Sequence, residues 1–152
     1  MKVFHFSLRL LILFICLALY GQLTGQSFRR AYSPNSSFCL DLTENTDGGF
    51  LLVGGLAADS SLFLQRTSAD GTILWTAHQQ LNGARGIAVC RSPDGGFAVL
   101  CENYLDGAVL RNILLKINSA GAIQWQKILD NPNLPNGFKD IVATSGGGYA
   151  LV

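Results

Sequence analysis

Short apolar segments of five to seven residues, separated by glycine-containing turns, dominate the chain after residue 37. They form two groups of four: Cys39–Thr43, Phe50–Gly54, Leu62–Thr67 and Thr72–His78, then Ile87–Arg91, Phe97–Cys101, Ile113–Asn118 and Ala122–Ile128. Their lengths and their β-branched and aromatic residues are typical of strands, and no amphipathic helical period of useful length accompanies them. The pattern therefore predicts an all-β protein.

The two groups are copies of one unit, and a third copy begins near residue 138. Trp75 and Trp125 lie 50 residues apart, whereas Asp47 and Asp94 lie 47 residues apart. We assign the extra length of the second unit to a loop over Glu102 to Asn112. The positions that define the repeat are Asp47, Gly48, Gly49, Phe50, Gly71 and Trp75, then Asp94, Gly95, Gly96, Phe97, Gly121 and Trp125, then Gly147, Gly148 and Tyr149. Self-similarity at this period predicts a repeat architecture.

The strands within a unit differ in their hydrophobic pattern. The third is continuously apolar, as in Leu62 to Leu64, so both of its faces must be covered, which sheets stacked face to face achieve. The fourth alternates, and we expect it to be a half-exposed outer strand. Its tryptophan is expected to cover the junction with a neighbouring unit rather than to form a ligand platform. Four antiparallel strands in about 50 residues predict a β-propeller-like blade.

The units divide the chain into about two and a half blades. The first blade spans residues 38–85, the second 86–137, and part of a third 138–152. Closed propellers have about 4 to 8 blades. We therefore expect the chain to be the N-terminal fragment of a longer repeat protein; the alternative is a short protomer that completes its ring by oligomerisation.

The Asp-Gly-Gly sequences are interpreted as tight turns. Asp47 and Asp94 can bond to their own backbone two residues on, and a glycine supplies the positive φ that such a turn needs. A calcium loop is the alternative interpretation, and it requires several oxygen ligands at alternating positions. Asp41, Glu44 and Asp47 do not keep that spacing, and the second unit retains only Asp94 of the three. Turn formation is favoured, and no metal or other cofactor is predicted.

Three of the four cysteines, Cys39, Cys90 and Cys101, lie in predicted strands. If the Pro93-Asp94 turn centres its hairpin, Cys90 lies opposite Ala98 and Cys101 lies opposite Ile87. The two sulfur atoms then point to opposite faces, which excludes a disulfide of ordinary geometry. We interpret all three residues as small buried hydrophobic side chains.

The first 25 residues have the three parts of a secretory signal peptide. Lys2 and Arg9 precede eleven apolar residues from Leu10 to Tyr20, and a short small and polar segment follows. Eleven residues are too few for a membrane span, which needs roughly 20. A lipoprotein signal around Cys16 is disfavoured because bulky Ile15 precedes the cysteine. We expect cleavage between Gly25 and Gln26, a linker over 26–37, and an exported protein with no stable membrane span.

Charge and motifs exclude several function classes. Removing residues 1–25 changes the formal net charge from +1 to −1, so no basic surface for nucleic acid is predicted. Nucleophile-elbow, zinc-protease, phosphate-loop and Cys-x-x-Cys motifs are absent from the sequence. His78 would be the only histidine of the mature chain, and nothing in the sequence places Asp41 and Asp140 together as a glycosidase pair.

The repeat resembles a known group of proteins. Thr-x-Asp-Gly-Gly-Phe/Tyr, followed by an apolar strand ending in Lys or Arg and then Gly-x-Ile-x-Trp, is similar to propeller-like tandem repeats of exported Bacteroidota-type surface proteins. Thr46 to Gly54, Arg66 and Trp75 fit closely, but Cys101 replaces a glycine and Gly146 replaces the aspartate. The resemblance covers most of 38–152 and implies a propeller, often linked to type IX secretion sorting domains; none is visible here, and no shared catalytic residues are implied.

Two classes of function remain open. The first, which we favour, is a noncatalytic exported or cell-surface scaffold that contacts protein or carbohydrate through loops such as Ala57 to Ser61 and Asn103 to Ala108. The second is a secreted propeller enzyme, for example a carbohydrate-active one, with catalytic residues in further blades. The fold alone does not decide between them.

Overall fold

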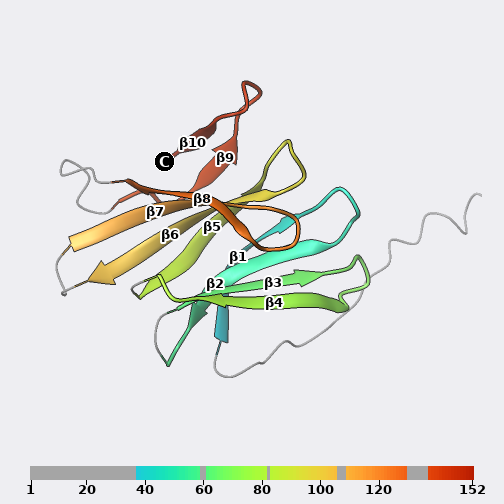
Figure 1. Cartoon of the computed structure of the whole chain (residues 1–152), viewed down its shortest axis with the longest axis horizontal. Coiled ribbons are helices and arrows are strands. Elements are labelled where there is room, and N and C mark those ends of the chain that lie inside the picture. Colours follow the sequence, from blue (N-terminus) through green and yellow to red (C-terminus); the bar gives the residue numbers. More distant parts are fainter. Residues whose placement is uncertain (1–36, 59–60, 82, 106–108, 130–136) are drawn as a thin grey trace, which may run out of the picture.

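The protein consists of two four-stranded antiparallel sheets and a C-terminal hairpin (Figure 1). The computed structural model describes residues 37–58, 61–81, 83–105, 109–129 and 137–152. The first sheet contains β1 (Ser37–Glu44), β2 (Phe50–Leu56), β3 (Leu62–Thr67) and β4 (Ile73–Gln79). The second contains β5 (Ala84–Arg91), β6 (Phe97–Leu105), β7 (Val109–Ile117) and β8 (Ile123–Leu129), and the hairpin contains β9 (Ile141–Ala143) and β10 (Tyr149–Leu151). Within the described ranges every regular element is a strand, which confirms the all-β prediction.

Each sheet follows the chain order, so neighbouring strands are joined by hairpins. All eight strands predicted for the two units are present, and five of them are two to four residues longer than expected. Strands β4 and β8 are largely exposed, whereas every residue of β3 is buried. The different hydrophobic patterns of the third and fourth segments thus correctly separated the covered strand from the outer one.

The predicted loop from Glu102 to Asn112 is wrong, because β6 and β7 extend through most of it and pair as far as Leu105 and Val109. Two of its polar residues, Glu102 and Asn112, are buried and bonded to other parts of the protein. The Glu102 carboxylate forms ion pairs with Arg85 and Lys139. The Asn112 side chain donates to the Cys101 carbonyl and exchanges two bonds with the Phe138 backbone. Polar composition was therefore not a sign of solvent exposure here.

The main core lies between the two sheets. Phe97, Val99, Leu115 and Ile117 of the second sheet and Leu51, Val53, Leu62 and Leu64 of the first are all fully buried in it. Strand β5 contacts both β1 and β2, so the edge of the second sheet lies against the first strands of the first sheet. This apolar interface accounts for the continuously apolar strands, since each sheet covers a face of the other.

The hairpin covers part of the opposite face of the second sheet. Ala98, Leu100 and Leu114 form a second buried cluster there with Ile141 of β9. These three residues occupy the repeat positions of Leu51, Val53 and Leu64, which face the second sheet from the first. The same face of the unit is therefore used twice, once to receive the second sheet and once to receive the hairpin.

The three cysteines of the described ranges are free, but only one of them is buried as predicted. Cys101 is buried, Cys90 is half-buried, and Cys39 is exposed because it lies on the edge strand β1, next to a bulge. Cys90 lies opposite Ala98 as predicted. Cys101 lies opposite Gly86 instead of Ile87, because a β-bulge shifts the register between Gly86 and Ala88. Cys90 and Cys101 nevertheless contact different clusters on opposite faces of the sheet.

A carboxylate of the first sheet binds the backbone of the second. The Asp41 Oδ2 atom accepts a hydrogen bond from the Val89 amide of β5 at 2.7 Å, while its Oδ1 atom accepts one from the Leu42 amide at 2.8 Å. The β-bulge between Cys39 and Asp41 accompanies this arrangement. The edge strand of one sheet is thereby hydrogen-bonded to the edge strand of the next.

Replacing Asp41 by alanine should loosen this connection. Loss of a charge-assisted hydrogen bond leaves the Val89 amide without its acceptor, and we expect the free energy of unfolding to fall by about 1–2 kcal/mol. Amide hydrogen exchange at Val89 should accelerate more than exchange in the centre of β3. Asp41→Asn, which retains an amide oxygen, is the matched control and should exchange more slowly than Asp41→Ala. Unchanged exchange at Val89 in Asp41→Ala would contradict the assigned bond.

Candidate binding pockets beside the Asp-Gly-Gly turns

The Asp-Gly-Gly turns are held by the side chain of their own aspartate. The Asp47 Oδ1 atom accepts a hydrogen bond from the Gly49 amide at 2.9 Å, and Asp94 does the same with the Gly96 amide at 3.1 Å. The first glycine of each turn has a positive φ, 75° at Gly48 and 81° at Gly95. Both findings confirm the turn mechanism inferred from the sequence.

Each aspartate also binds a buried cation that sequence reasoning did not pair with it. The Nη2 atom of Arg66, at the end of β3, lies 2.6 Å from both carboxylate oxygens of Asp47. Arg66 Nη1 donates to the carbonyls of Phe50 and Thr67. The Arg66 side chain is only 4 % exposed, whereas that of Asp47 is 56 % exposed. The turn therefore supplies a solvent-facing counter-ion for a cation buried beneath it.

The second unit builds the same arrangement with lysine. The Lys116 Nζ atom lies 2.9 Å from Asp94 Oδ2, 3.1 Å from the Ile117 carbonyl and 2.9 Å from Gln124 Oε1. Its three ammonium hydrogens are thus matched by three acceptors. Gln124 is the third of these acceptors, and the corresponding position in the first unit is occupied by Leu74. The signal for this pairing was the basic residue that ends the third strand of both units.

The second glycine of each turn has no room for a side chain. A Cβ atom at Gly49 would lie 2.5 Å from Arg66 Nη1 and still closer to the Thr67 carbonyl oxygen. At Gly96 a Cβ atom would lie 2.5 Å from Lys116 Nζ and still closer to the Ile117 carbonyl oxygen. The Gly-Gly pair therefore has two separate causes: the first glycine permits the turn, and the second lets the cation approach the backbone.

The same contacts lower the pKa values of both aspartates. Hydrogen bonding from the Gly49 amide, followed by that from Arg66, lowers the pKa of Asp47. For Asp94 the Lys116 ammonium is the main cause, followed by the Gly96 amide, and the pKa is again lowered. Because both carboxylates are more than half exposed, solvent screening limits what each pair contributes to stability.

The lowered pKa values of Asp47 and Asp94 predict that the fold becomes less stable in acid. A carboxylate whose pKa is lower in the folded than in the unfolded chain stabilises the fold above its unfolded value of about 3.9, and this stabilisation is lost as the pH falls through the folded value. Urea unfolding of the chain between neutral and strongly acidic pH should show this loss. The double variant Asp47→Asn/Asp94→Asn should be less stable at neutral pH and should lose less stability on acidification. Equal acid dependence in the variant and the parent would exclude these two carboxylates as the cause.

A tryptophan lies beside the cation in each sheet, because Arg66 pairs with Trp75 and Lys116 with Trp125 across neighbouring strands. Trp75 covers the junction between the sheets as predicted. Its Nε1 atom donates to the Ser119 carbonyl at 3.3 Å, and its ring packs on Gly121, where a Cβ atom would lie 2.8 Å from Cη2. Gly121 also has a positive φ of 83°. The ring of Trp75 is therefore fixed against the β7–β8 turn.

Trp125 differs from its counterpart. Its side chain is 42 % exposed, and its ring centroid lies 6.3 Å from that of Tyr149 at an interplanar angle of 55°. The expectation that this tryptophan covers a junction between units is thus met only in part, since one side of the indole remains open beside the hairpin. Burial of the tryptophan depends on the neighbouring unit, which the repeat motif does not encode.

In the third copy of the turn a threonine hydroxyl replaces the aspartate as the hydrogen-bond acceptor. Gly147 has a positive φ of 82°, as at the equivalent positions of the first two turns. Gly146 stands at the aspartate position, and the Gly148 amide donates to Thr144 Oγ1 at 3.1 Å instead. The Tyr149 hydroxyl bonds to Ser92 Oγ at 2.6 Å and so connects the hairpin to the second sheet. The turn geometry survives without the carboxylate.

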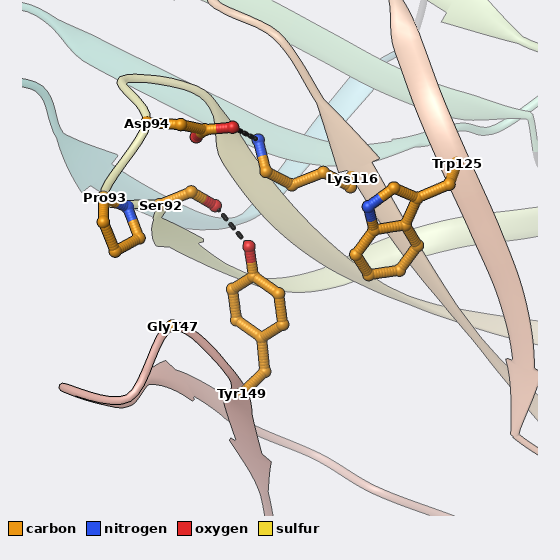
Figure 2. Close-up of a pocket in the computed structure, with 7 residues that line it drawn as sticks. All are labelled: Ser92, Pro93, Asp94, Lys116, Trp125, Gly147 and Tyr149. Carbon is orange, nitrogen blue, oxygen red and sulfur yellow. Dashed lines mark hydrogen bonds and ion pairs between the residues drawn. The ribbon is translucent and has the colours of Figure 1, made fainter.

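Two small pockets occupy equivalent places beside the first two turns. The first, of about 300 Å³, is lined by Asn45, Asp47, Arg66, Leu74, Trp75, Ser119 and Ala120. The second, of about 250 Å³, is lined by Ser92, Pro93, Asp94, Lys116, Trp125, Gly147 and Tyr149 (Figure 2). The aspartate, the cation and the tryptophan are shared, and the far wall comes from the β7–β8 turn in one case and from the hairpin in the other.

The other residues that the sequence analysis raised, Asp41, Asp140 and His78, line neither of these two pockets. Asp41 and Asp140 each accept a bond from a neighbouring backbone amide, at Leu42 and Ile141. The His78 ring meets Phe63 edge to face at 5.8 Å. No group of three or more potential metal ligands occurs in the described ranges. In those same ranges no helix is long and apolar enough to cross a membrane. Gly25 and Gln26 of the predicted cleavage site lie outside the described residues.

Comparison with known proteins adds no assignment. A scan of the chain against protein-family models found no match, and neither did a search among curated proteins. The interpretation of the pockets therefore depends on their geometry.

Proposed function

We propose that this chain is a noncatalytic, exported scaffold of β-propeller type that binds protein or carbohydrate at the cell surface. The observation that carries the proposal is the pair of equivalent pockets beside Asp47 and Asp94. Their frame is repeated, whereas the residues of the far wall differ. A constant frame with varied walls is the arrangement expected of a repeat protein that displays contact surfaces.

The chemistry of the pockets favours binding over catalysis. Each carboxylate is already bonded to a backbone amide and to a cation, which keeps its pKa low. A general acid at neutral pH needs a raised pKa, and a nucleophile needs a neighbouring base. Outside the pockets, burial raises the pKa of the half-buried Cys90 thiol and so opposes thiolate formation. The titratable groups of both pockets thus serve as fixed acceptors and counter-ions.

The repeated packing supports the propeller part of the proposal. The first strands of successive units, β1, β5 and β9, contact one another in order, and one face of the unit receives the next unit in both cases. Radial stacking of blades repeats one such interface around an axis. Export is supported by the basic start and the apolar segment from Leu10 to Tyr20.

The proposal is tested on the protein recovered from the outside of its host cells. We expect its N-terminus to be Gln26, and we expect the labelled protein to bind host cells or their extracted surface polysaccharide saturably while the polysaccharide stays intact. Recovery of the protein only from the cell interior would contradict export. Saturable turnover of the polysaccharide, abolished by one substitution in the chain, would replace the scaffold with an enzyme.

A further inference from the structure

We propose that the pocket between Trp125 and Tyr149 binds a neutral sugar residue. This inference rests on the proposed function, which it narrows from a cell-surface ligand to a single ring of a neutral glycan. The pocket is bounded by the Asp-Gly-Gly turn of the second unit, by β8 and by the hairpin (Figure 2).

Two aromatic rings form its apolar walls. Trp125 and Tyr149 face the same hollow from β8 and β10, with their rings inclined at 55° to each other. Such an open corner can contact the C–H face of a sugar ring, a surface that is apolar although the ring edge carries hydroxyls. The equivalent pocket of the first unit lacks this corner, because Trp75 is already packed on Gly121. The two units therefore differ in the aromatic surface that they expose, because Trp125 is 42 % exposed whereas Trp75 is partly buried against the main core.

Polar groups on the opposite side match hydroxyls. Asp94 uses one site on Oδ1 for the Gly96 amide and one on Oδ2 for Lys116, so its carboxylate retains two acceptor sites and is 54 % exposed. The Ser92 and Tyr149 hydroxyls share one hydrogen between them, which leaves the other hydrogen free to donate. A ligand must therefore both donate to a carboxylate and accept from a hydroxyl, as a polyol does.

The charged groups of the pocket argue against both anionic and cationic ligands. Lys116 directs all three of its hydrogens to protein acceptors, so it has none to offer a phosphate or carboxylate. An anion would also meet the exposed Asp94 carboxylate. A cation gains little, because the Asp94–Lys116 pair has no net charge. A neutral ligand is what remains, and the volume of about 250 Å³ lies below the range of about 300–1,000 Å³ typical of larger ligands.

The test is a titration of the whole chain with the methyl glycosides of glucose, galactose, mannose and N-acetylglucosamine, followed by calorimetry. For one sugar ring we expect a Kd of about 1 mM for at least one of the four. Trp125→Ala should weaken that binding at least about tenfold. Ile128→Ala, which removes another exposed apolar side chain of β8, is the matched control and should leave the Kd unchanged. Tyr149→Phe, which removes only the hydroxyl, should weaken binding by a few-fold.

Three results would overturn the inference: no saturable binding of any glycoside up to about twentyfold the expected Kd, equal binding by Trp125→Ala, or tighter binding of tetramethylammonium than of every glycoside. The cell-binding assay separates this failure from that of the proposed function. If Trp125→Ala still binds cells like the parent, the scaffold stands and the pocket assignment falls. If neither protein binds cells, the proposed function itself is wrong.

Discussion

Replacing Gly96 by alanine is expected to destabilise the chain by about 4 kcal/mol, a large part of the 5–15 kcal/mol that a domain usually possesses. The new Cβ atom would lie 2.5 Å from Lys116 Nζ and closer still to the Ile117 carbonyl oxygen, which belongs to the strand backbone. The lysine could move only by giving up its bonds to Asp94 and Gln124, and it would remain buried. Urea unfolding measures the effect, and Gly49→Ala should behave alike in the first sheet.

The third copy of the turn provides a matched control for this prediction. Gly148 occupies the same position of the turn, but a Cβ atom there would meet only Thr144 Oγ1, at 3.4 Å. Gly148→Ala should therefore change the free energy of unfolding by less than about 1 kcal/mol. Equal effects of Gly96→Ala and Gly148→Ala would show that turn conformation, and not the approach of the cation, requires the second glycine.

Replacing Phe97 by alanine should cost about 3–5 kcal/mol. Phe97 is fully buried between the two sheets, so its removal leaves a cavity lined by residues of both. The midpoint of urea unfolding should fall without a change in slope, since the folded sheets keep the same surface. Phe50, its repeat equivalent in the first sheet, is only half-buried, and Phe50→Ala should cost clearly less. A larger loss for Phe50→Ala than for Phe97→Ala would contradict the assignment of the core to the space between the sheets.

The local features of the fold could be predicted from the sequence, because they depend on neighbouring residues. Alternation and turn residues located all eight strands of the two units, and the Asp-Gly-Gly motif predicted the bond from Asp47 to the Gly49 amide. The register of the β5–β6 pair was not predicted correctly, because it depends on a β-bulge as well as on the turn. The bulge between Gly86 and Ala88 displaces Cys101 from Ile87, and nothing in the local composition indicates it.

The candidate site could be predicted only in part, because its geometry depends on contacts between units. The sequence singled out Asp94, Gly96 and Trp125, but it did not pair the aspartate with Lys116 at the end of the third strand. The sequence also gave the same prediction for both tryptophans. In the structure the β7–β8 turn packs on Trp75, whereas Trp125 is 42 % exposed. The sequence likewise did not indicate that Glu102 lies buried in a strand, because its ion pairs with Arg85 and Lys139 depend on the fold.

The two tryptophans allow the most direct test of this account, since they are the only ones in the chain. Their indole N–H groups should give two resolved NMR signals. On titration with a methyl glycoside, the Trp125 signal should shift saturably while the Trp75 signal, fixed by its bond to the Ser119 carbonyl, stays in place. A saturable shift of Trp75 with Trp125 unchanged, or no shift of either signal for any of the four glycosides, would contradict the account.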